Sequence, residues 1–68
     1  MEPWQEPIFE EKRDLDTKIA NLNAFMKTPQ FTDRITDNHR SLLREQALAM
    51  ATYSEILGAR LTFEPFPE

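Results

Sequence analysis

Cysteine is absent from the 68-residue sequence, and glycine and histidine each occur once. Without cysteine the chain has neither disulfides nor thiolate metal sites, and a lone His39 does not favour a histidine-based metal site. A single glycine, Gly58, leaves no glycine-rich phosphate loop. No apolar run is long enough to span a membrane, and no signal peptide is recognised. We therefore expect a soluble cytoplasmic protein that carries no metal and no cofactor.

Acidic side chains outnumber basic ones by twelve to eight, and the net charge is −4. Duplex DNA is bound by a concentrated positive surface, so we do not expect a DNA-binding protein. A small anionic ligand remains compatible with this composition, because exposed charges farther away than about 10 Å are screened. A few basic side chains directed at one pocket would be enough to bind it.

The length allows one domain, residues 1–68, and makes a monomer only marginally stable. Ordering the chain costs on the order of 100 kcal/mol, at roughly 1.5 kcal/mol per residue, and burial within a lone hairpin barely matches that cost. Small domains compensate with disulfides, metals or oligomerisation. Since the first two are disfavoured, we expect a homo-oligomer.

Prolines fall near the two ends and at Pro29, which leaves two long stretches free of helix breakers. We expect helices from about residue 7 to 27 and from about residue 37 to 63, the first with Pro7 in its first turn. Both carry apolar or small residues at steps that place them along one helix face. These seam residues are Ile8, Leu15, Ile19, Leu22 and Met26 in the first helix and Leu43, Ala47, Met50, Ser54, Leu57 and Leu61 in the second.

The segment between the helices, residues 28–36, is expected to be a connection with one short helical turn, in which Phe31 and Ile35 plug the end of the core. Thr36 is among its N-cap candidates. Residues 64–68 cannot continue a helix and should form a loose or docked tail. Together these features predict an all-α fold, an antiparallel two-helix hairpin with a short N-terminal segment that assembles into a homo-oligomeric helical bundle.

A second stripe runs beside the seam of the second helix, and one partner helix cannot cover both. Its members are Leu42, Gln46, Ala49, Tyr53, Ile56, Arg60 and Phe63. This pattern favours packing against other copies of the chain. Within the stripe, Gln46, Tyr53 and Arg60 recur every seven residues. They lie either at the rim of an oligomer interface, where Tyr and Arg are enriched, or in a pocket where copies of Arg60 surround a polyphosphate ligand.

The N-terminal segment carries Trp4 between Pro3 and Pro7, and we expect the prolines to hold it extended so that it folds back over a neighbouring hairpin. Trp4 then either plugs an apolar gap or stacks on a purine base. Arg13 and Lys18 lie partly away from the seam of the first helix. They either belong to a solvated face, with Asp14 and Lys18 paired at i, i+4, or bind a ligand.

No arrangement in the sequence indicates catalysis. It shows neither a Ser/His/Asp set nor a carboxylate pair with a further partner, and no metal-ligand spacing. We therefore interpret the chain as a binding protein and not an enzyme. The alternative to a ligand-binding protein is an oligomeric structural or protein-interaction module, whose docking surface would include Tyr53, Ile56 and Phe63.

Three segments, EEKRDLDTKIANLNAFM, TPQF and LLREQALAMATYSEILGARL, resemble those of small phage proteins built as a helical hairpin. The shared pattern is E-K-x-x-L-D-x-K-I-x-x-L-x-x-F at the start and M-x-x-Y-S-x-x-L-x-x-R-L at the end, and the resemblance spans roughly residues 4–63. The family includes the phage anti-CBASS and anti-Thoeris sponges. Membership implies homo-oligomers, often hexamers, that bind cyclic di- and trinucleotide immune signals in the host cell cytoplasm without cleaving them.

The resemblance also implies roles for individual residues. Trp4 occupies the place of an aromatic that stacks on a base, Lys18 that of a basic residue that reaches a phosphate, and Arg60 that of an arginine that meets phosphates near a three-fold axis. In this interpretation Trp4 and Arg60 serve separate pockets. The candidate ligand-binding residues are Trp4, Gln5, Lys18, Tyr53 and Arg60.

Overall fold

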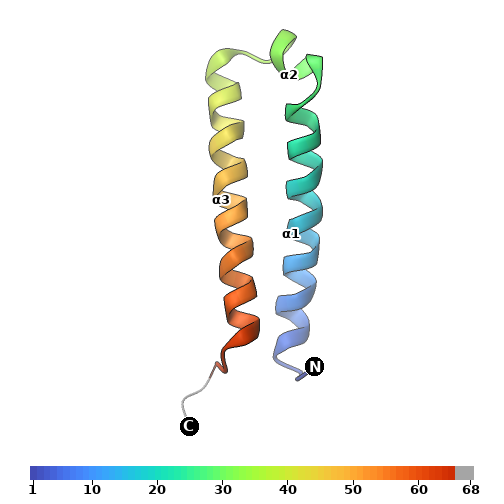
Figure 1. Ribbon diagram of the computed structural model, residues 1–68, viewed down its shortest axis with the longest axis vertical. Coiled ribbons are helices and arrows are strands. Elements are labelled where there is room, and N and C mark those ends of the chain that lie inside the picture. The colour runs from blue at the N-terminus through green and yellow to red at the C-terminus, as the bar shows by residue number, and fades with distance from the viewer. Residues whose placement is uncertain (66–68) are drawn as a thin grey trace.

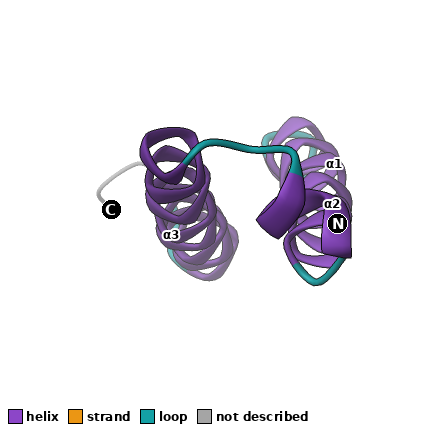
Figure 2. Cartoon of the chain, turned by 90° about the horizontal axis from the view of Figure 1, so that it is seen from above, coloured by secondary structure: helices purple, strands orange, loops and turns teal. Residues whose placement is uncertain are grey.

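The computed structural model describes residues 1–65 and folds as a helical hairpin. Two long helices, α1 (Gln5–Met26) and α3 (Asp37–Thr62), run antiparallel and are joined through the five-residue helix α2 (Pro29–Asp33). Figure 1 shows the start of α1 and the end of α3 at the same end of the hairpin, opposite α2. Seen along its length, the hairpin is a single layer of two helices side by side (Figure 2). The predicted all-α hairpin is confirmed.

The first helix begins two residues earlier than expected, and the segment before it is not extended as predicted. Trp4 is the N-cap residue with helical dihedral angles, φ −71° and ψ −19°. The Gln5 backbone N–H donates to the Glu2 carbonyl at 2.9 Å and closes a turn there. A proline fixes φ near the helical value and needs no hydrogen-bond partner in the first turn. Pro7 therefore continues this helix and does not hold the segment away from it.

The connection contains the expected helical turn as α2, and its neighbouring residues close the end of the hairpin. Thr36 caps α3, and its hydroxyl accepts from the His39 backbone N–H at 3.2 Å. The Arg40 guanidinium pairs with Asp37 and donates to the carbonyls of Thr32 and Ile35. Because these carbonyls lie outside the long helices, one side chain satisfies acceptors that would otherwise depend on water.

Phe31 of α2 is buried against both long helices. Its ring meets Phe25 of α1 edge to face, with centroids 6.1 Å apart. The guanidinium of Arg44 in α3 lies 5.3 Å from its centroid, within cation–π range. The prediction that Phe31 plugs the end of the core is therefore confirmed.

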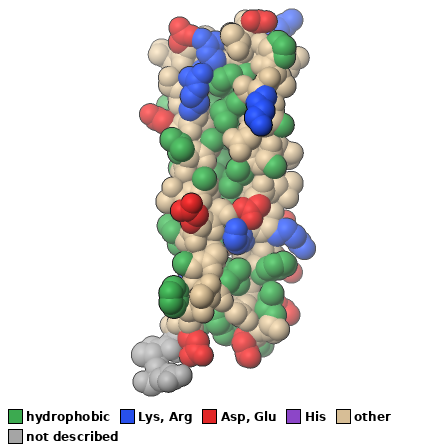
Figure 3. Space-filling view, in the orientation of Figure 1, with side chains coloured by type: hydrophobic (Ala, Val, Ile, Leu, Met, Phe, Trp, Pro, Cys, Tyr) green, Lys and Arg blue, Asp and Glu red, His purple; other side chains and the backbone are tan. Residues whose placement is uncertain are grey.

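The seams of the two helices face each other as predicted, but they enclose little. Leu57 of α3 is fully buried and Ile8 of α1 nearly so, while most other seam residues are half-buried. Each long helix has one long neighbour, and one neighbour cannot cover a whole apolar face. The second stripe of α3 remains exposed along its length. On the face shown in Figure 3, apolar side chains form a band between the helices that reaches the surface.

α3 ends at Thr62, one residue before the predicted end, and Phe63 has extended dihedral angles. Of the predicted tail, Glu64 and Pro65 follow as non-helical chain. Phe66, Pro67 and Glu68 lie outside the described residues. Within the part of the chain that the structure describes, no helix is long and apolar enough to cross a membrane.

Candidate ligand-binding site

A groove of about 450 Å³ lies at the open end of the hairpin, where α1 begins and α3 ends. Its walls are largely apolar, with the indole of Trp4 contributed from one helix start and the guanidinium of Arg60 from the last turn of the other. Glu64 and Pro65, which follow the end of α3, also line it. The remaining lining residues are Ile8, Ile56, Ala59 and Phe63.

Gln5 holds the two sides of this groove together. Its side-chain amide donates to the Leu61 carbonyl at 3.0 Å, and its side-chain oxygen accepts from the Glu2 backbone N–H at 2.7 Å. One residue therefore ties the N-terminal turn to the last turn of α3. Trp4 immediately precedes Gln5, so these bonds also hold the backbone of Trp4 in place. Gln5 thus supports the groove, although it is not one of the residues that line it.

Arg60 is exposed, and no carboxylate of residues 1–65 forms an ion pair with it. Its place in the last turn of α3 is favourable, because the negative end of the helix dipole stabilises a cation there. A guanidinium carries donors in a planar fork that matches phosphate oxygens. An aromatic ring and a guanidinium on one groove are the two groups needed to hold a base and a phosphate.

Tyr53 lies on α3 two turns before Arg60, outside the groove. Its hydroxyl donates to the Glu11 carboxylate of α1. This hydrogen bond, with partial burial and the negative charge of Glu11, raises the pKa of Tyr53 above its ordinary value of 10.0, while the positive charge of Arg60 opposes the rise. Tyr53 therefore joins the helices and stays protonated at neutral pH.

The single tyrosine makes this contact directly measurable. We expect phenolate absorbance during an alkaline titration to give a midpoint above 10.0, and Glu11→Gln to lower it, because the main cause of the shift is removed. A group that binds its proton more tightly when folded contributes stability below its unfolded pKa, and loses it as the pH rises through the folded value. Equal midpoints in the two proteins would show that Glu11 does not hold the phenol.

Lys18 is exposed on α1 and lies two turns after Glu11, so it shares the helix face that Tyr53 meets but not the open-end groove. The Asp14–Lys18 ion pair, which the solvated-face interpretation included, does not form among residues 1–65. Asp14 lies near Arg13 instead, with 3.9 Å between Nε of Arg13 and Oδ1 of Asp14. Among the predicted site residues, the structure brings Trp4 and Arg60 together on one groove, and Gln5 joins the two chain segments that carry them.

Trp4 and Arg60 are expected from the family resemblance to serve separate pockets, but within one chain they share a groove.

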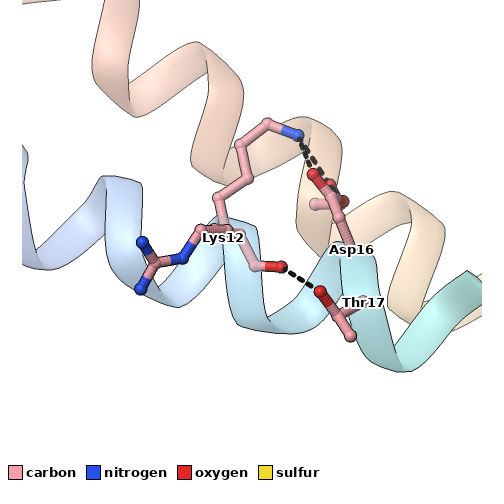
Figure 4. Close-up of polar contacts among 5 residues, drawn as sticks. Lys12, Asp16 and Thr17 are labelled. Atoms are coloured by element: carbon pink, nitrogen blue, oxygen red, sulfur yellow. Dashed lines mark hydrogen bonds and ion pairs between the residues drawn. The ribbon is translucent and has the colours of Figure 1, made fainter.

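A polar cluster between the helices was missed by sequence reasoning (Figure 4). The Lys12 ammonium donates to Asp16 at 3.0 Å and to the Ser54 hydroxyl at 2.8 Å, and Ser54 donates to Asp16. The hydrogen bonds from Ser54 and then Lys12 hold the pKa of Asp16 below its usual value. Ser54 had been interpreted as a small seam residue, whereas it is a buried hydroxyl with two partners. The sequence did contain a signal for this cluster. Lys12 and Asp16 are spaced i, i+4 on the first helix, and Ser54 is a polar residue on the seam of the second.

Gly58 leaves room for this cluster. A Cβ there would lie 3.4 Å from Cε of Lys12, at the limit of ordinary contact. The cluster borders a second, shallow groove of about 590 Å³ on α1, lined by Phe9, Arg13 and Thr17 among others. Among the residues that the structure describes, no group of three His, Asp or Glu side chains is placed to hold a metal ion.

The long antiparallel helices, the half-covered seam and the groove at the open end define a small helical-hairpin protein that leaves a groove and apolar side chains outside its own core. The chain belongs to the Sequestin family, whose model matches residues 2–63. The match confirms the family resemblance that the sequence motifs indicated, and the family name denotes sequestration. No match to a curated protein or to a solved structure was found.

Proposed function

We propose that this protein is a phage anti-defence sponge, which binds cyclic di- or trinucleotide immune signals and sequesters them without cleaving them. In this role it acts in the cytoplasm of the infected host cell as a homo-oligomer, with hexamers as the expected form. The observation that carries the proposal is the placement of Trp4 and Arg60 on one groove in a chain of the Sequestin family.

The chemistry of the groove suits a nucleotide. Trp4 offers a ring on which a base can stack, worth about 1–3 kcal/mol per base. Arg60 offers charge-assisted hydrogen bonds to phosphate oxygens. Sequestration is stoichiometric and needs tight binding, and a nanomolar dissociation constant corresponds to about −12 kcal/mol. One groove on one chain supplies only part of this, so we propose that several copies share the ligand, with Lys18 and Tyr53 contributing from other faces.

In the proposed oligomer, copies of Arg60 gather around a symmetry axis. Without a ligand their positive charges would repel one another, and a bound ring of phosphates would neutralise them. The ligand should therefore stabilise the assembly by mass action. A thousandfold excess over the dissociation constant contributes about 4 kcal/mol, which corresponds to a rise in melting temperature on the order of 20–30 °C for a domain of this size.

The test is thermal denaturation with a panel of cyclic di- and trinucleotides, with linear dinucleotides as matched controls. We expect at least one cyclic nucleotide to raise the melting temperature, and heat denaturation of the complex to release it intact. Recovery of a linear product would show instead that the protein is a phosphodiesterase.

The second candidate function, an oligomeric structural or protein-interaction module, is favoured by the exposed apolar residues Tyr53, Ile56 and Phe63. It predicts no shift with any nucleotide in the panel. That result, obtained with folded protein, would overturn the sponge proposal and leave the module.

A further inference from the structure

α3 carries two neighbouring faces, and only one of them packs against α1. Every residue of its seam is buried or half-buried, whereas every residue of its second stripe is exposed. Leu57 of the seam is fully buried, for example, while Ile56 directly before it exposes 51% of its surface. One residue corresponds to a turn of about 100° around a helix. A rotation of α3 by that angle would therefore exchange the two faces.

Apolar burial alone does not choose between these faces. Each face carries four large apolar or aromatic residues, Leu43, Met50, Leu57 and Leu61 on the seam and Leu42, Tyr53, Ile56 and Phe63 on the second stripe. Arg60 does not prevent burial of the second stripe, because an arginine can pack its stem on apolar surface and keep its guanidinium in water. The hydrophobic effect is non-directional and scales with apolar area, so it favours both rotations to a similar degree.

The two faces differ in a notch that two small residues form on the seam. Ser54 and Gly58 lie one helical turn apart, and Lys12 of α1 lies across from both. The Lys12 ammonium donates to the Ser54 hydroxyl at 2.8 Å, and its Cε lies 3.4 Å from where a Cβ of residue 58 would be. Lys12 thus occupies the space that these small residues leave.

The Ser54 hydroxyl also serves both charges of the polar cluster at once. It accepts from Lys12 and donates to Asp16, and only 6% of the residue is exposed. Figure 4 shows the Lys12 and Asp16 side chains meeting beside α3, where the ammonium donates to the carboxylate at 3.0 Å. A hydroxyl is suited to this place, because it is both a donor and an acceptor.

A rotated α3 would lose the notch and the hydroxyl together. The positions that Ser54 and Gly58 hold would pass to the residues directly before them, Tyr53 and Leu57, which are both large. Lys12 would then face a ring and an aliphatic side chain, and a covered polar group that loses its partner is costly. The polar contacts therefore discriminate between two rotations that apolar burial leaves nearly equal.

We propose that the cluster of Lys12, Asp16 and Ser54, together with the notch at Gly58, determines which face of α3 packs against α1. Its contribution is to the uniqueness of the fold more than to its stability, a role that polar groups fill when an apolar pattern allows two arrangements. The three cluster residues are positioning residues for the open-end groove. Arg60 directly precedes a seam residue, so the rotation would turn it toward α1 and away from its present place on the groove.

The test replaces the cluster by apolar residues, in the triple variant Lys12→Met, Asp16→Leu and Ser54→Ala. Nuclear Overhauser contacts of leucine methyl groups report which face meets α1, because Leu43 lies on the seam and Leu42 directly before it on the second stripe. Labelled chains are diluted into an excess of deuterated chains, so that only contacts within one chain are recorded.

In the unaltered chain we expect one set of α3 resonances, with contacts to α1 from Leu43 and none from Leu42. The triple variant should show a second set, in which Leu42 contacts α1. Its melting temperature should be equal or higher, since replacing a covered ion pair by apolar residues is often neutral or stabilising.

The matched control makes the same kinds of replacement on exposed surface, in the variant Asp14→Leu, Lys18→Met and Thr52→Ala. Asp14 and Lys18 have the same i, i+4 spacing as the cluster pair, and all three residues are exposed. This variant should retain a single set of resonances with contacts from Leu43. A second set of equal size in the control would show that added apolar surface alone loosens the choice of face, and would overturn the proposal.

A single set of resonances in the triple variant, with contacts from Leu43 only, would show that packing selects the face and would also overturn the proposal. Two single replacements keep the question answerable if the triple variant does not fold. Ser54→Ala removes the α3 partner of Lys12 but introduces a strong helix former, and should show a smaller second set. Ser54→Thr keeps the hydroxyl and should show none, so equal spectra of these two variants would contradict the role of the hydroxyl.

No ligand enters these measurements, so their outcome is independent of the nucleotide test. A chain that binds no nucleotide but acquires a second α3 orientation without the cluster supports this inference and removes the sponge function.

Discussion

Replacing Arg60 by alanine is expected to weaken binding of a cyclic nucleotide about 10- to 100-fold while leaving the protein folded and assembled. A hydrogen bond to a charged group contributes about 1.5–3 kcal/mol, which corresponds to that range. Arg60 is exposed and forms no ion pair with residues 1–65, so its loss should cost the hairpin little stability. Isothermal titration calorimetry measures the affinity, and sedimentation measures the assembly.

The matched control is Arg34→Ala, which removes an exposed arginine at the closed end, away from the groove. Arg60→Lys should retain part of the affinity, because lysine keeps the charge but loses the planar fork of donors.

Trp4→Ala distinguishes the two arrangements of the site. If Trp4 and Arg60 act in one groove, both variants weaken binding of the same nucleotide, whereas separate pockets would divide their effects between two nucleotides. Normal binding by Arg60→Ala would show that the arginine is only a surface residue.

Leu57→Ala should produce the largest loss of stability of any single truncation in the hairpin. Leu57 is the one fully buried large side chain of residues 1–65. Truncating a buried leucine costs about 2–5 kcal/mol, whereas small domains have only about 5–15 kcal/mol in total. We expect the melting temperature to fall by on the order of 10–35 °C at fixed protein concentration, measured by circular dichroism.

Leu48→Ala is its control, because the same atoms are removed from a side chain that is 71% exposed on the same helix. It should change the free energy of unfolding by less than about 0.5 kcal/mol. Equal losses of unfolding free energy in the two variants would mean that Leu48 is as well covered as Leu57. A second copy of the hairpin would then have to pack on the surface of α3 that carries Leu48.

The helices could be predicted because their signals are local. Proline at position 29 and the N-cap at Thr36 act on their own backbone neighbours, and a seam such as Ile8 to Met26 repeats along one helix. The N-terminal segment was predicted wrongly for a related reason. A proline near a helix start is compatible with both extended and helical chain, and only the turn between Glu2 and Gln5 decides between them.

The candidate site was less predictable, because its residues come from opposite ends of the sequence. Trp4 and Arg60 could each be identified from its own surroundings, but nothing local indicated that they line one groove. Ser54 fitted a small position on the seam, and its partners Lys12 and Asp16 are far away in sequence. Their meeting depends on how the two helices slide and rotate against each other.

The sequence by itself determined the two helices, their seams, the exposed second stripe and the family, since each depends on residue types at regular spacings along one element. Tertiary structure alone decided the register between α1 and α3, and with it the Trp4–Arg60 groove, the Glu11–Tyr53 hydrogen bond and the Lys12–Asp16–Ser54 cluster. The physical reason is that a helix period specifies which face is buried. The height at which two faces meet is set by side-chain packing and hydrogen bonds across the interface.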